Sequence, residues 1–222
     1  YAVNALYTMD TIQYTVMSYF DASNTGADWV ASDNKTYYAQ TPMLHDVLAI
    51  QQLYGVDTTT RLGDTRYGFN STADSVIYDF TQNKHPIMTL WDAGGVDWLD
   101  LSGFSTASRI DLNPGAFSDC DGMTKNIAIA YGCNIENAAG GSGNDNITGN
   151  ALANILNGND GNDTLNGGAG NDTLTGGAGA DILIGGDGDD KLYADVADFL
   201  LQFDGGAGYD ILYVSGTLSL TY

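Results

Sequence analysis

The chain has 222 residues, with 28 acidic residues against seven basic ones, and its net charge is −21 at neutral pH. Such a charge opposes binding to nucleic acid and to anionic membranes, and the sequence contains no run of 18 apolar residues that could span a bilayer. We therefore expect neither kind of partner. The length allows one ordinary domain and a repeat module.

Two segments near the amino terminus have recognisable patterns. Residues 14–20 read Tyr-Thr-Val-Met-Ser-Tyr-Phe. Residues 42–55 place apolar side chains at helical spacing and end in a glycine, Gly55. The pattern predicts a helix over 42–55.

Residues 92–97, Asp-Ala-Gly-Gly-Val-Asp, put carboxylates around unobstructed carbonyl groups. This composition is typical of a calcium loop, and the alternative is an ordinary turn before a strand at 98–101. We expect His45 on a helix surface or cap and His85, which precedes Pro86 in a loop, in solvent. Neither histidine has zinc-finger spacing to a cysteine, so we expect no metal site from the two cysteines. Cys120 and Cys133 are the only cysteines, and they form either a local disulfide or two buried free thiols.

A tandem repeat of nine residues begins at Gly140 and runs to residue 193. A typical copy, residues 167–175, reads Gly-Gly-Ala-Gly-Asn-Asp-Thr-Leu-Thr. This pattern is that of the RTX parallel β-roll, a calcium-binding solenoid. A flexible glycine-rich linker is the alternative, but the apolar residue keeps its phase. The expected inward-facing residues are Ile147, Leu165, Leu174, Ile182 and Leu192.

Each repeat is expected to form a tight turn followed by a short strand. Glycines permit the turn and leave carbonyl oxygens accessible, and the aspartate adds a carboxylate oxygen, so six to eight hard ligands can gather. Two repeats make one coil, so each turn stacks on the turn eighteen residues away. Calcium should then lie between stacked turns. Asn154 replaces the aspartate in residues 149–157, and we expect weak or missing calcium there.

The repeat phase breaks after Tyr193. Residues 194–204 are mostly apolar and are expected to form a short helix or strand. One further copy follows at 205–213, and 214–222 alternate like a strand. Because the apolar content of the repeats is low and their charge is dense, we expect them to be disordered without cations and to fold with calcium.

Taken together, the segments at 14–20, 42–55, 60–71, 91–100 and 135–193 resemble the serralysins, which are secreted zinc metalloproteases of the metzincin class. The resemblance identifies residues 14–20 as the Met-turn, with Met17 as the apolar floor below zinc and Tyr19 as the catalytic residue that stabilises an oxyanion. It implies a mainly β fold, in which a right-handed parallel β-roll follows a small α+β remnant of the catalytic domain.

The resemblance, together with the repeat pattern, also implies the calcium ligands. The upstream ligands would be Arg61, Gly63, Thr65, Asp92, Gly94 and Asp97 in one site and Gly95, Asn134 and Glu136 in another, with Asn134 in place of the family's threonine. The ligands in the roll would be Gly141, Gly143, Asp145, Gly158, Asp160, Gly161, Asp163, Gly168, Gly170, Asp172, Gly177, Gly179, Asp181, Gly186, Gly188 and Asp190.

The sequence lacks the H-E-x-x-H motif that holds zinc in such proteases, and it has only two histidines. We therefore expect a chain that starts after the zinc helix and is inactive alone. Zinc, the N-terminal half and protein substrates would belong to the intact parent, which is secreted by a signal-peptide-independent route. The alternative function is a stand-alone calcium-binding module of an RTX adhesin or toxin.

The expected domain boundaries follow from these segments. Residues 1–55 would be the end of the catalytic domain, and 56–222 the calcium-binding β-roll domain. Within the latter, 140–193 would be the regular repeats and 194–222 a capping segment.

Overall fold

The computed structural model describes residue 9 and residues 11–18, 21–198 and 203–216. The chain divides into two compact units, one made of Tyr1–Asp97 and Asn113–Ile135 and the other of Trp98–Leu112 and Glu136–Tyr222. No helix of the described part is long and apolar enough to cross a membrane.

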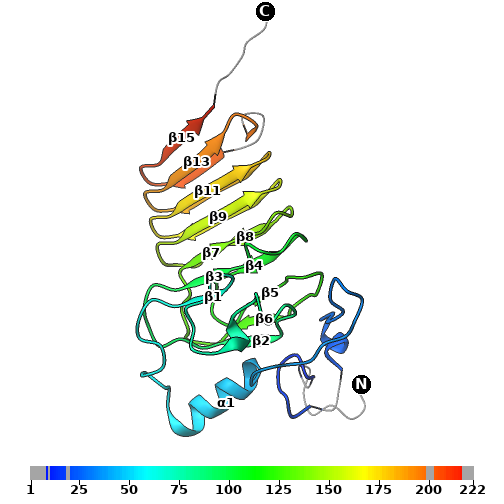
Figure 1. Cartoon of the computed structure of the whole chain (residues 1–222). Coiled ribbons are helices and arrows are strands. Elements are labelled where there is room, and N and C mark those ends of the chain that lie inside the picture. The colour runs from blue at the N-terminus through cyan, green and yellow to red at the C-terminus, as the bar shows by residue number, and fades with distance from the viewer. Residues whose placement is uncertain (1–8, 10, 19–20, 199–202, 217–222) are drawn as a thin grey trace, which may run out of the picture. The chain divides into compact units, whose positions relative to one another are not determined.

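The described residues of the first unit form one α-helix, two short 3₁₀ helices and short strands (Figure 1). In chain order they are η1 (Ala22–Thr25), α1 (Leu44–Tyr54), β1 (Arg66–Gly68), η2 (Val76–Tyr78), β2 (Met88–Leu90), β5 (Phe117–Ser118) and β6 (Ile127–Ile129). The strands β2, β6 and β5 form a sheet in that order, in which β2 is parallel and β5 antiparallel to β6.

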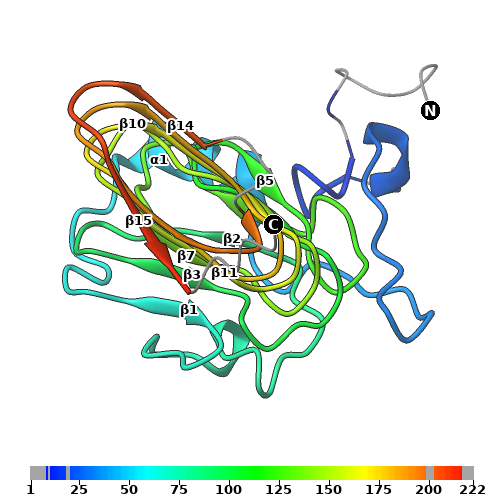
Figure 2. The same ribbon diagram turned by 90° about the horizontal axis from the view of Figure 1, so that it is seen from above.

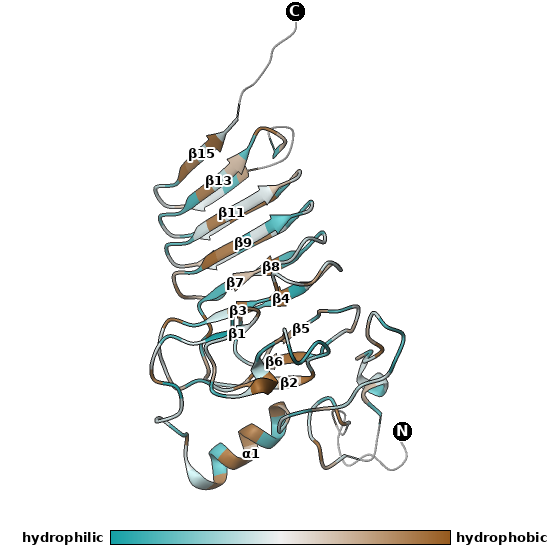
Figure 3. Ribbon diagram, in the orientation of Figure 1, coloured by the Kyte–Doolittle hydropathy of each residue, from teal (hydrophilic) through white to brown (hydrophobic). Residues whose placement is uncertain are grey.

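Helix α1 confirms the helix predicted over 42–55. The Asp46 carboxylate accepts a hydrogen bond from the Met43 N–H at 2.8 Å, and Gly55 ends the helix with φ +88°. Hydrophobic and hydrophilic residues alternate along the helix in Figure 3. Leu44 is buried, whereas Leu53 is 75% exposed. The helix therefore packs through its first turn and leaves apolar surface near its end.

The second unit is a parallel β-roll, which confirms the predicted fold. Its strands are β3 (Trp98–Asp100), β4 (Arg109–Asp111), β7 (Asn137–Ala139), β8 (Asn146–Thr148), β9 (Ile155–Asp160), β10 (Thr164–Ala169), β11 (Thr173–Ala178), β12 (Ile182–Asp187), β13 (Lys191–Asp195), β14 (Phe203–Ala207) and β15 (Ile211–Ser215). One sheet runs β3-β7-β9-β11-β13-β15 and the other runs β4-β8-β10-β12-β14. Seen along the stack, the successive coils superimpose (Figure 2).

The strand register follows the eighteen-residue coil predicted from the repeat. Leu165 lies between Ile147 and Leu183 in one sheet, and all three side chains are buried. The prediction that Ile182 points inward is wrong. Strand residues alternate between the two faces, and Leu183 has the buried face while Ile182 is half-buried.

The break after Tyr193 adds two residues to the coil without ending the roll. Leu192 pairs with Leu212, twenty residues later, and β14 and β15 form the predicted further copy. Residues 217–222, predicted as a strand, lie outside the described residues. Leu212 is 44% exposed although it stands in an inward position. In the described part no coil covers β15, whose hydrophobic residues colour it brown in Figure 3.

We predict that Leu174→Ala lowers the free energy of unfolding by about 2–5 kcal/mol, because it removes a fully buried side chain stacked between Leu156 and Leu192. Leu152→Ala is the control, since Leu152 lies in the same coils but is exposed. Urea unfolding in calcium measures both. Equal losses for the two variants would contradict the inward stack.

Candidate functional site

The repeat aspartates form a ladder along each edge of the roll. One carboxylate oxygen of each residue accepts the backbone N–H of the residue eighteen positions earlier. Asp163 Oδ1 accepts from Asp145 N at 2.7 Å, and Asp181 Oδ1 accepts from Asp163 N at 2.8 Å. On the other edge Asp172 Oδ1 accepts from Asn154 N, and Asp190 Oδ1 accepts from Asp172 N, both at 2.8 Å. The carboxylates thus connect neighbouring coils.

The second oxygen of these carboxylates has no protein partner. Oδ2 is buried and makes no hydrogen bond in Asp163, Asp172, Asp181 and Asp190. A buried charged oxygen without a partner is costly, and a bound cation would remove that cost. Asp145 differs, because its Oδ2 accepts from Gly141 N at 2.5 Å and its Oδ1 from Ser108 N at 2.6 Å.

Carbonyl oxygens lie beside the unpaired carboxylate oxygens. A Cβ on Gly158 would lie 2.2 Å from Asp163 Oδ2 and 2.4 Å from the carbonyl oxygen of Gly176. The same arrangement recurs nine residues later, where a Cβ on Gly167 would lie 2.2 Å from Asp172 Oδ2 and 2.5 Å from the Gly185 oxygen. A carboxylate and a carbonyl of the next coil therefore meet at each of these glycines.

The remaining predicted ligands of the roll lie in or beside these turns. Strand β9 ends at Asp160, whose side chain is exposed and outside the ladder. Six glycines have positive φ, which the turn geometry requires: Gly161, Gly168, Gly170, Gly177, Gly179 and Gly188. Gly186 also has positive φ, and its Cβ would lie 2.0 Å from the Gly168 oxygen. A Cβ on Gly143 would lie 2.5 Å from Ala107 N.

Burial raises the pKa of these carboxyl groups. Desolvation is the largest cause, and it raises the pKa of Asp163 to about 7 and that of Asp172 to about 6, against the lowering effect of the ladder hydrogen bonds. The pKa values of Asp181 and Asp190 are raised for the same first reason. These carboxyl groups therefore take up protons more readily than exposed aspartates do when no cation is bound.

Asn154 shows what happens where aspartate is absent. Its amide oxygen accepts from Asn150 N at 2.8 Å, and its Nδ2 donates to the Glu136 carbonyl oxygen at 2.7 Å. Both ends of the amide are thus satisfied by the protein. This supports the expectation of weak or missing calcium at residues 149–157.

In the described ranges, no three or more histidine, cysteine, aspartate or glutamate side chains gather in a group that could hold a metal ion. An ion in the roll would therefore depend on carbonyl oxygens beside a carboxylate oxygen, which is a ligand set that calcium accepts. The donor chemistry of the turns fits that ion.

The upstream loop brings together several of its predicted ligands. Asp97 Oδ1 accepts from Thr65 N at 2.7 Å, and the Thr65 hydroxyl donates to the Gly63 oxygen at 3.0 Å. That oxygen would lie 2.6 Å from a Cβ on Gly95. Arg61 precedes this loop with a left-handed φ of +52°. The loop therefore collects oxygens around a buried carboxylate.

Asp92 is buried, but protein donors serve both of its oxygens. The Tyr67 hydroxyl donates to Oδ2 at 2.7 Å, and Gly94 N donates to Oδ1 at 3.1 Å. Burial raises the pKa of Tyr67, so this hydroxyl stays protonated. Asn134 and Glu136 belong to different units, and their joint site with Gly95 stays a prediction.

The predicted remnant of the protease site is only partly described. Tyr19 lies outside the described residues. Met17 is 78% exposed, so it forms no apolar floor in this structure. His45 is half-buried on α1, where its ring contacts that of Tyr14 at 4.8 Å.

One sequence prediction needs correction and one open question is answered. His85 does not face solvent, because Nδ1 lies 2.5 Å from Asp121 Oδ2 and its ring stacks on Tyr37. Of the two alternatives for Cys120 and Cys133, the structure has two buried free thiols. Each thiol has a polar neighbour instead. Asn126 Nδ2 donates to the first at 3.1 Å, and Asp92 N donates to the second at 3.3 Å.

Asp198 belongs to the ladder although sequence analysis missed it. Its Oδ1 accepts from Asp181 N at 2.6 Å, and its Oδ2 accepts from Asp195 N at 2.7 Å. The residue lies seventeen positions after Asp181, outside any glycine-rich turn. Its only signal was that it is one of three aspartates, with Asp195 and Asp204, in an otherwise mostly apolar segment.

Comparison with known proteins agrees with this geometry. Residues 56–218 match the family described as Peptidase M10 serralysin C terminal. The chain belongs to the serralysin C-terminal family. It is 48% identical over 146 residues to Serralysin B of Dickeya chrysanthemi, covering 65% of this chain and 29% of that protein.

Two further relatives show the same coverage. The identity is 49% over 149 residues to Metalloprotease AprA of Pseudomonas entomophila (strain L48), which is 67% of this chain and 30% of that protein. It is 47% over 151 residues to a serralysin of Photorhabdus luminescens, which is 68% of this chain and 30% of that protein. The chain therefore spans under a third of the length of these serralysin relatives.

We predict that Gly179→Ala destabilises this serralysin roll far more than Gly132→Ala. Both glycines have positive φ, so each substitution costs about 1 kcal/mol of backbone strain. Only at Gly179 would the Cβ meet another atom, the Gly161 oxygen at 1.8 Å, which adds about 2 kcal/mol or more. Urea unfolding in calcium measures the difference, and equal effects would refute the close stacking of turns.

The raised pKa values predict a pH dependence for the calcium-free chain. A folded-state pKa above the unfolded value means that stability is fully present below about pH 4 and is lost as the pH rises to about 7. We expect more β-structure by circular dichroism at about pH 5 than at about pH 8. Asp163→Asn should weaken this dependence, and a profile unchanged in that variant would contradict the assignment.

Proposed function

We propose that this chain is the calcium-binding β-roll portion of a secreted, serralysin-like zinc endopeptidase, and that calcium folds it after export. One observation carries the proposal: the buried Oδ2 atoms of four ladder aspartates, which lack a protein partner. The family match and relatives named serralysin and metalloprotease support the parent's activity. The whole relatives are more than three times longer than the matched part, so proteolysis belongs to the parent.

The residues that would hold calcium in the roll are the ladder aspartates and the turn carbonyls beside them. Bound calcium supplies positive charge between oxygens that otherwise repel one another. Asp163, Asp172, Asp181 and Asp190 would each offer Oδ2, while Oδ1 keeps its hydrogen bond to the neighbouring coil. Ion binding and coil stacking then stabilise each other, so binding free energy becomes folding free energy.

Zinc is a different case. Among the described residues no group of three or more metal-binding side chains is present, and Tyr19 lies outside them. The described residues therefore do not fit a zinc site, and we assign no step of peptide hydrolysis to them. In the intact parent, zinc and the substrates would act elsewhere, and the roll would stabilise the protease.

A stand-alone calcium-binding module, as in an RTX adhesin or toxin, is the second candidate. The lack of a zinc group in the described part is what favours it for this polypeptide. Casein cleavage separates the two functions. A gain of activity when the chain is combined with the amino-terminal half of a serralysin, beyond that of the half alone, supports the protease portion, and no gain supports the module.

We predict that the purified chain holds several calcium ions and no zinc, and that a chelator abolishes its β-sheet circular dichroism. Asp163→Asn should raise the calcium concentration at the folding midpoint roughly tenfold, because it removes a charged ligand. Asp187→Asn is the charge-matched control, since Asp187 is exposed in the same roll. Elemental analysis and calcium titration measure both effects. Stoichiometric zinc, or equal midpoints for the two variants, would overturn the proposal.

A further inference from the structure

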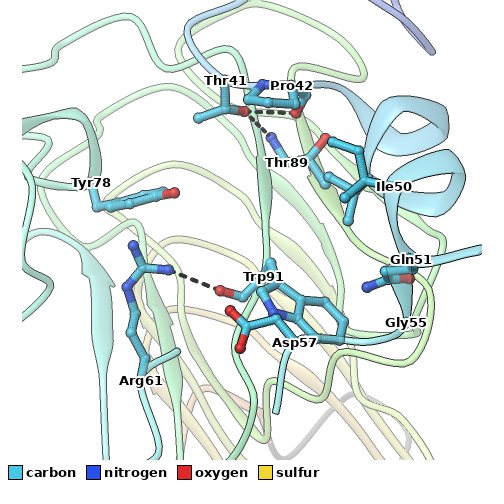
Figure 4. Close-up of a pocket in the computed structure, with 11 residues that line it drawn as sticks. Thr41, Pro42, Ile50, Gln51, Gly55, Asp57, Arg61, Tyr78, Thr89 and Trp91 are labelled. Carbon is cyan, nitrogen blue, oxygen red and sulfur yellow. Dashed lines mark hydrogen bonds between the residues drawn. The ribbon is translucent and has the colours of Figure 1, made fainter. Parts of the chain in front are cut away.

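A cavity of about 280 Å³ lies in the first unit, between α1 and the segment that carries Arg61, Tyr78 and Trp91 (Figure 4). Its lining is mostly apolar and includes Pro42 and Ile50. The volume equals roughly nine water molecules at about 30 Å³ each, which suits one side chain with its peptide group. None of the proposed calcium chemistry of the roll uses this cavity.

Three lining residues carry buried polar atoms that have no hydrogen-bond partner. They are the amide nitrogen of Gln51, the hydroxyl of Thr89 and the indole nitrogen of Trp91. Thr89 is only 3% exposed, and Figure 4 shows Gln51 pointing from α1 toward Trp91. Buried polar groups are normally satisfied, so three such atoms without a protein partner around one cavity point to a binding site for a polar ligand.

The chemistry of the lining selects the ligand. The Trp91 indole N–H and the Gln51 amide nitrogen are hydrogen-bond donors, and they require an acceptor such as a carbonyl oxygen. The Thr89 hydroxyl can donate, and it can also accept a hydrogen bond from an N–H. The Arg61 guanidinium is already engaged, because it donates to the Trp91 oxygen and to Asp74. Asp57 also lines the cavity. Hydrogen bonds from Thr60 and Thr59 lower the pKa of Asp57 to about 2, so its carboxylate is negatively charged at neutral pH and disfavours an anionic ligand.

We propose that this cavity binds a short uncharged peptide, with one apolar side chain against Pro42 and Ile50 and its peptide group against Gln51, Thr89 and Trp91. A peptide group supplies both the acceptor and the donor that these atoms lack. This inference rests on the first unit alone and does not depend on calcium binding by the roll.

The probe is N-acetyl-leucinamide, added to the full chain in calcium while the indole N–H of Trp91 and the side-chain amide of Gln51 are followed by NMR. We expect saturable shifts with a dissociation constant of about 1–10 mM, as befits a ligand of this size. N-acetylglycinamide, which lacks the side chain, and N-acetyl-leucine, which is anionic, should each bind at least about fivefold more weakly. No saturable shift would mean that the cavity holds water only, and equal binding of the three probes would also overturn the proposal.

Variants test the polar contacts. Thr89→Val keeps the shape and removes the hydroxyl, so it should weaken N-acetyl-leucinamide binding about fivefold, while Thr89→Ser should retain binding. Tyr54→Phe is the control on α1, since Tyr54 is exposed and does not line the cavity. Unchanged affinity in Thr89→Val would refute the contact. If that variant does not fold, the comparison of the three probes on the unmodified chain decides.

Discussion

The roll depends on the buried carboxylate at each turn. One oxygen of the aspartate accepts a backbone N–H of the previous coil, which fixes the spacing of the stack, and the other oxygen is left without a protein donor. The same group that joins the coils therefore leaves a buried negative charge without a partner at the turns of Asp163, Asp172, Asp181 and Asp190. Because each coil contacts only its neighbours, the unpartnered carboxylate oxygens repeat along the roll, and no common core compensates for them.

The hydrogen bonds that the protein itself makes to these turn side chains differ along the roll. At the start of the regular repeats, Asp145 receives N–H donors at both oxygens, and Asn154 satisfies its own amide through Asn150 and Glu136. At Asp163, Asp172, Asp181 and Asp190 the second oxygen has no such partner, whereas at Asp198 it accepts from Asp195 N. The side chains of Asp145 and Asn154 therefore need no cation, and the coils that carry them would serve as a template on which the proposed cation-binding coils stack.

Sequence reasoning predicted the fold well because a nine-residue period fixes both the turn and the strand. It predicted Leu165 and Leu174 inside, yet placed Ile182 there, although nine residues after Leu174 the period leads to Leu183. The pattern predicted aspartates in the turns but not the hydrogen-bond ladder, which is a relation between coils. Asp198 and the environment of His85 depend on contacts far apart in sequence, which no local pattern shows.

The composition explains why an ion suits this fold. One buried leucine or isoleucine per nonapeptide offers much less apolar burial per residue than an ordinary domain core, while the glycines lose more conformational entropy than other residues on ordering. Hydrogen bonds between coils offset part of this cost. Asp163 Oδ2 and the Gly176 oxygen both lie beside Gly158, and their partial negative charges repel each other. Under the proposed calcium binding, a divalent cation would turn this repulsion into attraction where the coils meet, so the acidic turns would hinder folding when ions are scarce and stabilise the fold when calcium is bound.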